Sequence, residues 1–220
     1  MPSSRRRRAT YAALGLASLF SAALIAVRVG YTHEPRHAGL LWNLFLAWIP
    51  FGLAIVVYDR QRGGARPLAL LPLGLLWLLF LPNAPYILTD FKHLDPPGTV
   101  PLWFDVLVIA APAWIGMLLG FFSLYLMQGV VRRIAGEAWS WALAVGALCL
   151  SSFGIYLGRV LRWNSWDVFT NPRGLGRDVW ASLADPLGYP HTMAMTVLLT
   201  GFLVAMYLTL YAFTRLDADS

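Results

Sequence analysis

Residues 77–95 read WLLFLPNAPYILTDFKHLD. A strongly apolar run is interrupted by Pro82 and Pro85, and the chain then reaches the titratable residues Asp90 and His93. Proline removes a backbone donor and disfavours helix in the residue before it, so this stretch predicts a helix that breaks. Irregular backbone at membrane depth is tolerated only where protein buries it or where it lines a cavity. The segment is therefore the first place to look for a functional site.

The composition indicates that lipid is the solvent around this segment. Of the 220 residues, 58% are hydrophobic and 13% are charged, whereas soluble domains average about 45–50% and about 25%. A helix needs roughly 20 apolar residues to cross a bilayer. The expected fold class is all-α, a polytopic bundle of transmembrane helices in a lipid bilayer.

Six apolar segments have the composition of membrane spans. They cover residues 9–29, 38–58, 67–81, 103–127, 139–160 and 192–213. The third is short and reaches Leu88 only if the chain stays helical through the proline step. The first is expected to be a retained signal-anchor helix, because its apolar run continues through Val27. The expected organisation is a basic N-terminus (residues 1–8), one six-helix domain (9–213) and a short tail (214–220).

Lysines and arginines predict the orientation of the helices. With the N-terminus inside, the cytoplasmic segments carry more of these cations, and two of those segments are short loops, where the positive-inside rule counts most. They are Arg5 to Arg8, Arg60, Arg62, Arg66, Arg132, Arg133 and Arg215. Both termini are therefore expected in the cytoplasm. Because the arginines lie between apolar blocks and form no continuous basic face, nucleic acid is not an expected partner.

This orientation places the histidines and most of the acidic residues on the outer side. If chemistry occurs, Asp90 or His93 is the expected acid or base, and Asp105 at the head of the fourth span is a further candidate. A catalytic zinc site usually needs three protein ligands, and only His93 lies near these acids, so no metal or cofactor is expected. The alternative is a solvated or ion-paired loop, and whether the protein is an enzyme stays open.

A second polar segment ends the fifth span, where residues 158–167 read GRVLRWNSWD. Arg159 and Arg162 share a helical face near the outer headgroups, where two guanidinium groups could clamp a phosphate or carboxylate. They could equally pair with nearby aspartates. The expected ligand is anionic, either lipid-linked or phosphorylated. Its candidate binding residues are Asn83, Arg159, Arg162, Asn164 and Asp167.

Glycines stand one helical turn apart on two spans, as Gly116 and Gly120 on the fourth and Gly154 and Gly158 on the fifth. Small residues at this spacing let membrane helices approach closely, so both pairs predict close packing. Two other functions remain alternatives to a ligand site, namely a small-solute or ion-coupled transporter and a membrane assembly or scaffold protein. The sequence does not predict the oligomeric state.

Three motifs resemble a known family. They are Asn43-Leu-Phe-Leu-Ala-Trp-Ile-Pro-Phe, Leu81-Pro-Asn-Ala-Pro-Tyr-Ile-Leu-Thr-Asp90 and Ser152-Phe-Gly-Ile-Tyr-Leu-Gly-Arg-Val-Leu-Arg-Trp-Asn-Ser-Trp-Asp167. They are similar to the bacterial multi-pass membrane family catalogued as domain of unknown function 1361, over roughly residues 41–213. The resemblance implies a protein of the bacterial cytoplasmic (inner) membrane. It brings no established activity, so no catalytic residue follows from it.

Overall fold

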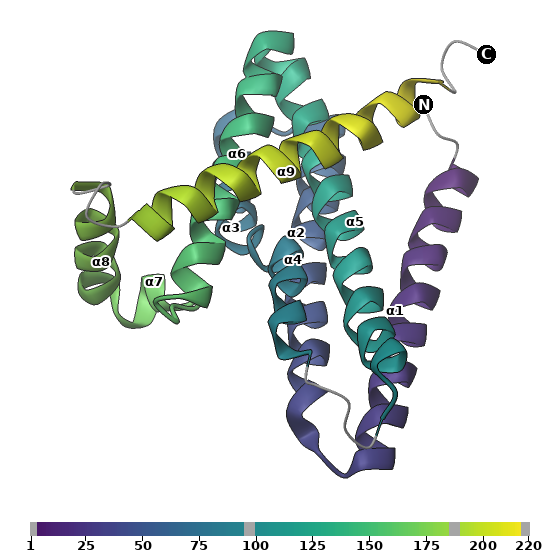
Figure 1. Cartoon of the computed structure of the whole chain (residues 1–220). Helices are drawn as coiled ribbons and strands as arrows, with labels where there is room; N and C mark the ends of the chain where they lie inside the picture. Colours follow the sequence, from purple (N-terminus) through teal and green to yellow (C-terminus); the bar gives the residue numbers. More distant parts are fainter. Residues whose placement is uncertain (1–3, 95–99, 185–189, 217–220) are drawn as a thin grey trace.

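The computed structural model describes residues 4–94, 100–184 and 190–216, which form helices joined by turns, with no β-strand among them (Figure 1). The long helices are α1 (Ser4–Thr32), α2 (Gly39–Arg62), α3 (Pro67–Phe80), α5 (Leu102–Ala135), α6 (Glu137–Arg159) and α9 (Pro190–Leu216). The shorter ones are η1 (Pro35–Ala38), α4 (Asn83–Tyr86), η2 (Ile87–His93), α7 (Asp167–Thr170) and α8 (Pro172–Ala184). Helices satisfy their own backbone groups, as lipid requires.

Six helical segments are long and apolar enough to cross a membrane, which confirms the predicted number of spans. Large apolar side chains such as Leu16, Leu68 and Leu198 are exposed on the outside of the bundle. Contact with lipid is favourable for such a surface, whereas soluble proteins rarely expose large apolar patches to water. The fourth span is longer than expected, because α5 continues past Met127 to Ala135. The chain is thus a multi-pass membrane protein.

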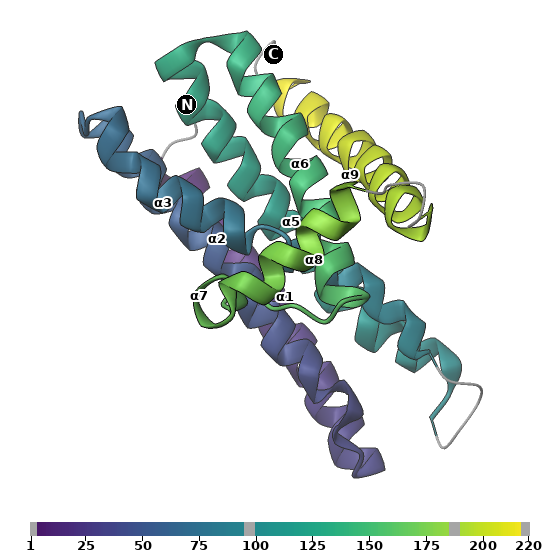
Figure 2. The same cartoon turned by 90° about the vertical axis from the view of Figure 1, so that its left-hand side faces the viewer.

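The central helix of the bundle is α5. In the most apolar stretch of α5, 61% of the residues are buried inside the protein, whereas the corresponding share for α9 is 11%. One apolar core surrounds Trp77 and Leu124, and a second surrounds Phe51 and Ile109. α9 crosses diagonally over the bundle in Figure 1 and runs beside α6 in Figure 2. The elements on either side of α5 therefore pack against this one helix.

The two ends of the bundle differ in chemistry. At one end, tight turns at Gly64 and Gly136 join α2 to α3 and α5 to α6, with φ of 84° and 94°, which glycine adopts without strain. Arg62, Arg132 and Arg133 lie at this end, which we call the basic end, and α1 begins and α9 ends on the same side (Figure 1). At the opposite end, α2 and α5 begin and η2 ends.

Candidate functional site

The proline step ends α3 and changes the backbone hydrogen bonding that follows. The N–H of Ala84 donates to the Leu81 carbonyl rather than to that of Phe80. The Phe80 carbonyl instead accepts a hydrogen bond of 2.9 Å from the side-chain amide of Asn83. Buried backbone groups need such partners, so Asn83 stabilises the break itself. The chain stays helical through α4 and η2, as the longer version of the third span predicted.

The same Asn83 amide also connects the break to the segment that follows α6. Its Nδ2 donates to the hydroxyl of Ser165 over 2.9 Å. The first and second polar segments of the sequence therefore lie side by side, as expected from the orientation of the spans. This proximity brings the end of α3 and the end of α6 to one place in the protein.

Two glycine pairs hold the broken segment from two helices. A Cβ on Gly116 of α5 would lie 2.5 Å from the Ala84 carbonyl oxygen, and one on Gly120 would lie 2.9 Å from the Ala84 Cβ. On α6, a Cβ on Gly154 would lie 2.8 Å from the ring of Pro82. The predicted close packing is confirmed. Its partner is the short α4 region rather than a second long helix.

Asp90 of η2 is buried and forms an ion pair with Arg159 at the end of α6. The Arg159 Nη1 lies 3.0 Å from Asp90 Oδ1, and their side chains are 12% and 7% exposed. Asn43 of α2 donates to the other carboxylate oxygen over 3.0 Å. Arg159 also donates to the Thr89 carbonyl and lies over the Tyr86 ring. The ion-pair alternative for Arg159 is the one observed, and little of its guanidinium faces outward.

Asp105 forms a separate ion pair at the start of α5. Arg28 of α1 donates from Nε to one carboxylate oxygen over 2.9 Å and from Nη2 to the other over 3.4 Å. Both side chains are buried, and Arg28 donates further to Thr32. Asp105 therefore ties α1 to α5 and does not join Asp90 and Arg159. The side chain of His93 lies outside the part of the chain whose side chains the structure describes.

The remaining predicted ligand residues form a turn after α6. Arg162 has a φ of 62°, a left-handed conformation, and the N–H of Trp163 bonds back to the Leu157 carbonyl. Asp167 accepts hydrogen bonds from the backbone and side chain of Asn164. The backbone bond holds the pKa of the Asp167 carboxyl below its usual value. Arg162 is exposed, and no described carboxylate pairs with it.

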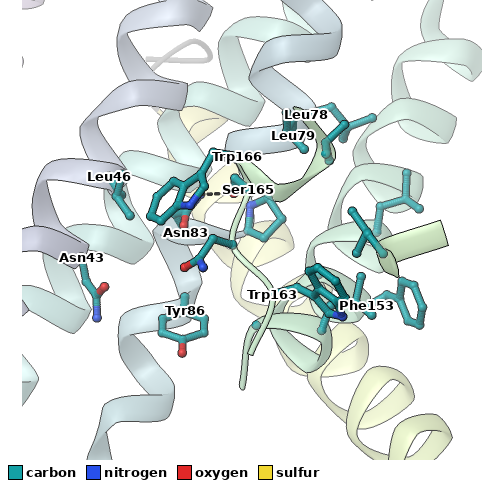
Figure 3. Close-up of a pocket in the computed structure, with 18 of the residues that line it drawn as sticks. Asn43, Leu46, Leu78, Leu79, Asn83, Tyr86, Phe153, Trp163, Ser165 and Trp166 are labelled. Atoms are coloured by element: carbon teal, nitrogen blue, oxygen red, sulfur yellow. Dashed lines mark hydrogen bonds between the residues drawn. The ribbon is translucent and has the colours of Figure 1, made fainter. Parts of the chain in front are cut away.

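A cavity of about 420 Å³ lies beside the break, between α2, α3, α4, α6 and the segment after α6 (Figure 3). We call it the break cavity. Leucines of α3 lie at one end of it in this view, and Tyr86 and Trp163 lie toward the other. Its apolar wall includes Leu75, Leu79, Leu150 and Phe153, and its polar groups are Asn43, Asn83, Tyr86, Asn164 and Ser165. None of the side chains that line it is charged.

The break cavity opens to the lipid-facing surface of the bundle. Trp42, Leu75 and Leu150 line it and are 53%, 66% and 53% exposed. These side chains belong to membrane-spanning helices, so their exposed parts face lipid. An apolar chain could therefore enter from within the bilayer without crossing water.

Of the five predicted ligand residues, Asn83 and Asn164 line the break cavity, whereas Arg159, Arg162 and Asp167 do not. Asn43 and Ser165 also line the cavity and were not among the predicted ligand residues. A polar residue such as Asn43 within an apolar span needs a buried partner, and that requirement is a signal available from sequence. No comparable signal marks Ser165, whose contact depends on the turn after α6.

One sequence pattern resembles a metal site without forming one. Residues 33–37 read HEPRH, and an H-E-x-x-H motif binds zinc when a helix places both histidines on one face. Here His33 has a φ of 56° and Pro35 starts a 3₁₀ helix, so the two histidines do not share a helical turn. Within the described residues, no group of three His, Cys, Asp or Glu side chains could hold a metal ion.

Comparison with known proteins places these features in a family. The family described as "Protein of unknown function (DUF1361)" matches residues 42–207. The chain belongs to this family. The matched region contains the break, both glycine pairs and the whole break cavity, while α1 and its Arg28 lie outside it. No curated protein and no solved structure matches the chain.

Proposed function

We propose that the protein binds an amphipathic, lipid-linked ligand in the break cavity. The observation that carries this proposal is one cavity with an apolar wall at membrane depth, an opening toward lipid and a hydrogen-bonding end. Ligand sites are typically about 300–1,000 Å³, mostly apolar, with a few placed polar groups. The proposed location is a bacterial cytoplasmic membrane, with both termini inside.

The apolar part of the ligand would lie against α3 and α6. Leu75, Leu79 and Leu150 present a continuous apolar wall between the lipid-facing surface and the break. Each CH₂ group that leaves water contributes about 0.8 kcal/mol, but a chain that already lies in lipid gains little from this effect. Specificity would therefore come from the headgroup.

The headgroup would bond to amides and hydroxyls at the polar end. Asn164 and Ser165 line the cavity from the segment beyond the end of α6, and Asn43 and Tyr86 line it from α2 and α4. Because the lining carries no charge, a glycosyl or other hydroxyl-rich headgroup fits it better than a phosphate. We propose this neutral site in place of the two-arginine clamp that the sequence suggested, because Arg159 pairs with Asp90.

Binding of defined lipids tests the proposal. Purified protein is titrated with monoglucosyl diacylglycerol and with phosphatidylglycerol of identical acyl chains, and bound lipid is measured by native mass spectrometry. Leu79→Trp places an indole in the break cavity and is expected to abolish glycolipid binding. Leu71→Trp is the matched control, because Leu71 is exposed on the same helix outside the cavity.

Equal binding by the two tryptophan variants would contradict the site. Stronger binding of phosphatidylglycerol that disappears in Arg162→Gln would contradict the neutral headgroup. It would instead support the anionic ligand that the sequence suggested, held by the exposed guanidinium next to the cavity.

A further inference from the structure

A second cavity, of about 340 Å³, lies at the basic end between α1, α2, α5 and the last turns of α9. We call it the arginine cavity. Its lining contains no carboxylate and four arginines, which are Arg7, Arg62, Arg132 and Arg133. The break cavity contains no cation, so the two cavities differ in the chemistry that they offer.

Two of these arginines are neutralised by nearby acids. Arg7 forms two hydrogen bonds with the Asp59 carboxylate, of 3.0 and 3.1 Å. Arg132 lies 3.6 Å from a carboxylate oxygen of Glu137. Such partly exposed pairs are weak, but they cancel most of the field of these two cations.

The positive charges of Arg62 and Arg133 are not neutralised in this way, because no described carboxylate pairs with either residue. Their guanidinium groups lie 5.9 and 5.2 Å from the centre of the Tyr58 ring, and that of Arg7 lies 5.9 Å from it. The ring face offsets part of the repulsion among three cations. A bound anion would offset much more, since guanidinium forks match the oxygens of a phosphate.

The floor of the arginine cavity is apolar. Phe51, Phe122 and Leu126 line it within the membrane-spanning parts of α2 and α5. Arg7 and Arg62 stand at the ends of their spans, where lipid headgroups lie. The cavity therefore offers cations at headgroup level and apolar side chains below them.

We propose that the arginine cavity binds one anionic phospholipid, with its phosphate between Arg62 and Arg133 and an acyl chain along the apolar floor. Basic pockets between membrane helices recognise anionic headgroups in this way. The apolar floor favours a lipid over free phosphate. The proposal rests on different residues from the break cavity and does not depend on its function.

The test compares two double variants that remove the same charge from the same end of the protein. The affinity of purified protein for phosphatidylglycerol and for phosphatidylcholine is measured by native mass spectrometry. Arg62→Gln with Arg133→Gln is expected to weaken phosphatidylglycerol binding by about tenfold. Arg60→Gln with Arg66→Gln is the control and should stay close to wild type, because both residues are exposed and neither lines the cavity.

A third variant separates a shaped site from general attraction to charge. Gly129 lines the cavity, and a Cβ there would lie 3.9 Å from the Tyr58 ring, so Gly129→Leu fills space while every arginine remains. It should lose phosphatidylglycerol binding with an unchanged thermal melt, whereas Leu79→Trp in the break cavity should keep it. Equal losses in the two double variants, or full binding by Gly129→Leu, would overturn the proposal. Displacement of the lipid by millimolar inorganic phosphate would overturn the choice of a lipid.

Discussion

Arg159 and Asp90 form an ion pair that is almost closed to solvent. Removing two charges from water costs several kcal/mol, and their mutual attraction offsets this cost only when further hydrogen bonds are made. Asn43 supplies one of these to the carboxylate, and the Thr89 carbonyl accepts one from the guanidinium. The Arg28–Asp105 pair between α1 and α5 has the same character. These four charged residues therefore hold helices in place, and the side chains that line the break cavity are neutral.

Loss of one member of the Arg159–Asp90 pair should be more harmful than loss of both. Arg159→Met is expected to lower the free energy of unfolding by about 3–5 kcal/mol, because it leaves a buried carboxylate unpaired. Adding Asp90→Asn should restore a large part of that loss. Arg162→Met serves as the control, within about 0.5 kcal/mol of wild type, because that side chain is exposed. Denaturant unfolding in detergent measures all four proteins, and a stable Arg159→Met that only loses ligand would contradict the structural role.

The contact between Gly116 and Ala84 predicts a second effect of a single residue. A Cβ at Gly116 would lie 2.5 Å from a backbone oxygen, which cannot move without displacing the break. Gly116→Ala should therefore lower the free energy of unfolding by about 1–3 kcal/mol. Gly129→Ala on the same helix has an ordinary contact at 3.9 Å and should be neutral or slightly stabilising. Equal stabilities for the two variants would show that α4 does not pack this closely.

The short α4 region contacts three other segments of the chain, which are α5, α6 and the segment after α6. It sits against the glycine pairs of α5 and α6, and Asn83 reaches Ser165 beyond α6. Both α3 and α6 start at the basic end, and α6 extends past the end of α3 because it is longer. The segment after α6 then turns back toward the end of α3, and the break cavity lies in the space between them. The irregular backbone is thus buried in protein on some sides and lines a cavity on another, as lipid requires.

Asn83→Ala should loosen this junction. The exchange of backbone amides in residues 163–170 should become faster. The free energy of unfolding should fall by about 1–3 kcal/mol, because Asn83 loses two hydrogen bonds, one to the Phe80 carbonyl and one to Ser165. Ser165→Ala should loosen the same segment. The double variant should be less destabilised than the sum of the two, because both changes break one contact. If hydrogen–deuterium exchange showed that the effects of the two single variants add exactly in the double variant, that contact would be contradicted.

Several of these elements were predictable from the sequence, and others were not. Length and hydropathy alone indicate six spans, and the spacing of Gly116 and Gly120 indicates close packing. Neither pattern names a partner, so the packing of glycines against α4 could not be foreseen. The pairing of Arg28 with Asp105 could not be foreseen either, because the two residues lie 77 positions apart in the sequence. Pairings over such distances depend on how the helices assemble.

Across the whole protein, the two cavities differ in the charge of the side chains that line them. The arginines gather around one cavity at the basic end, and a neutral cavity lies next to the break. The positive-inside rule predicts that the basic end faces the cytoplasm. In the predicted orientation the break cavity opens toward the outer half of the bilayer.

Cysteine labelling tests the orientation. In a Cys149→Ala background, Arg173→Cys places an exposed thiol on α8 and Arg66→Cys places one between α2 and α3. A membrane-impermeant maleimide added to intact cells is expected to label the first variant alone. The second should react only after the membrane is permeabilised. The reverse pattern would contradict the orientation and would place the break cavity toward the cytoplasm.

Photocrosslinking tests whether the acyl chain of a bound glycolipid lies in the break cavity. A glucosyl diacylglycerol with a diazirine in its acyl chain is incorporated into nanodiscs with the purified protein, and the crosslinked peptides are identified by mass spectrometry. Crosslinks are expected to concentrate on residues 75–79 and 150–157, and to disappear in Leu79→Trp but not in Leu71→Trp. Leu16 and Leu19 on α1, each 68% exposed to lipid, report the background. Labelling of the break cavity at the same rate as these two leucines would contradict the claim.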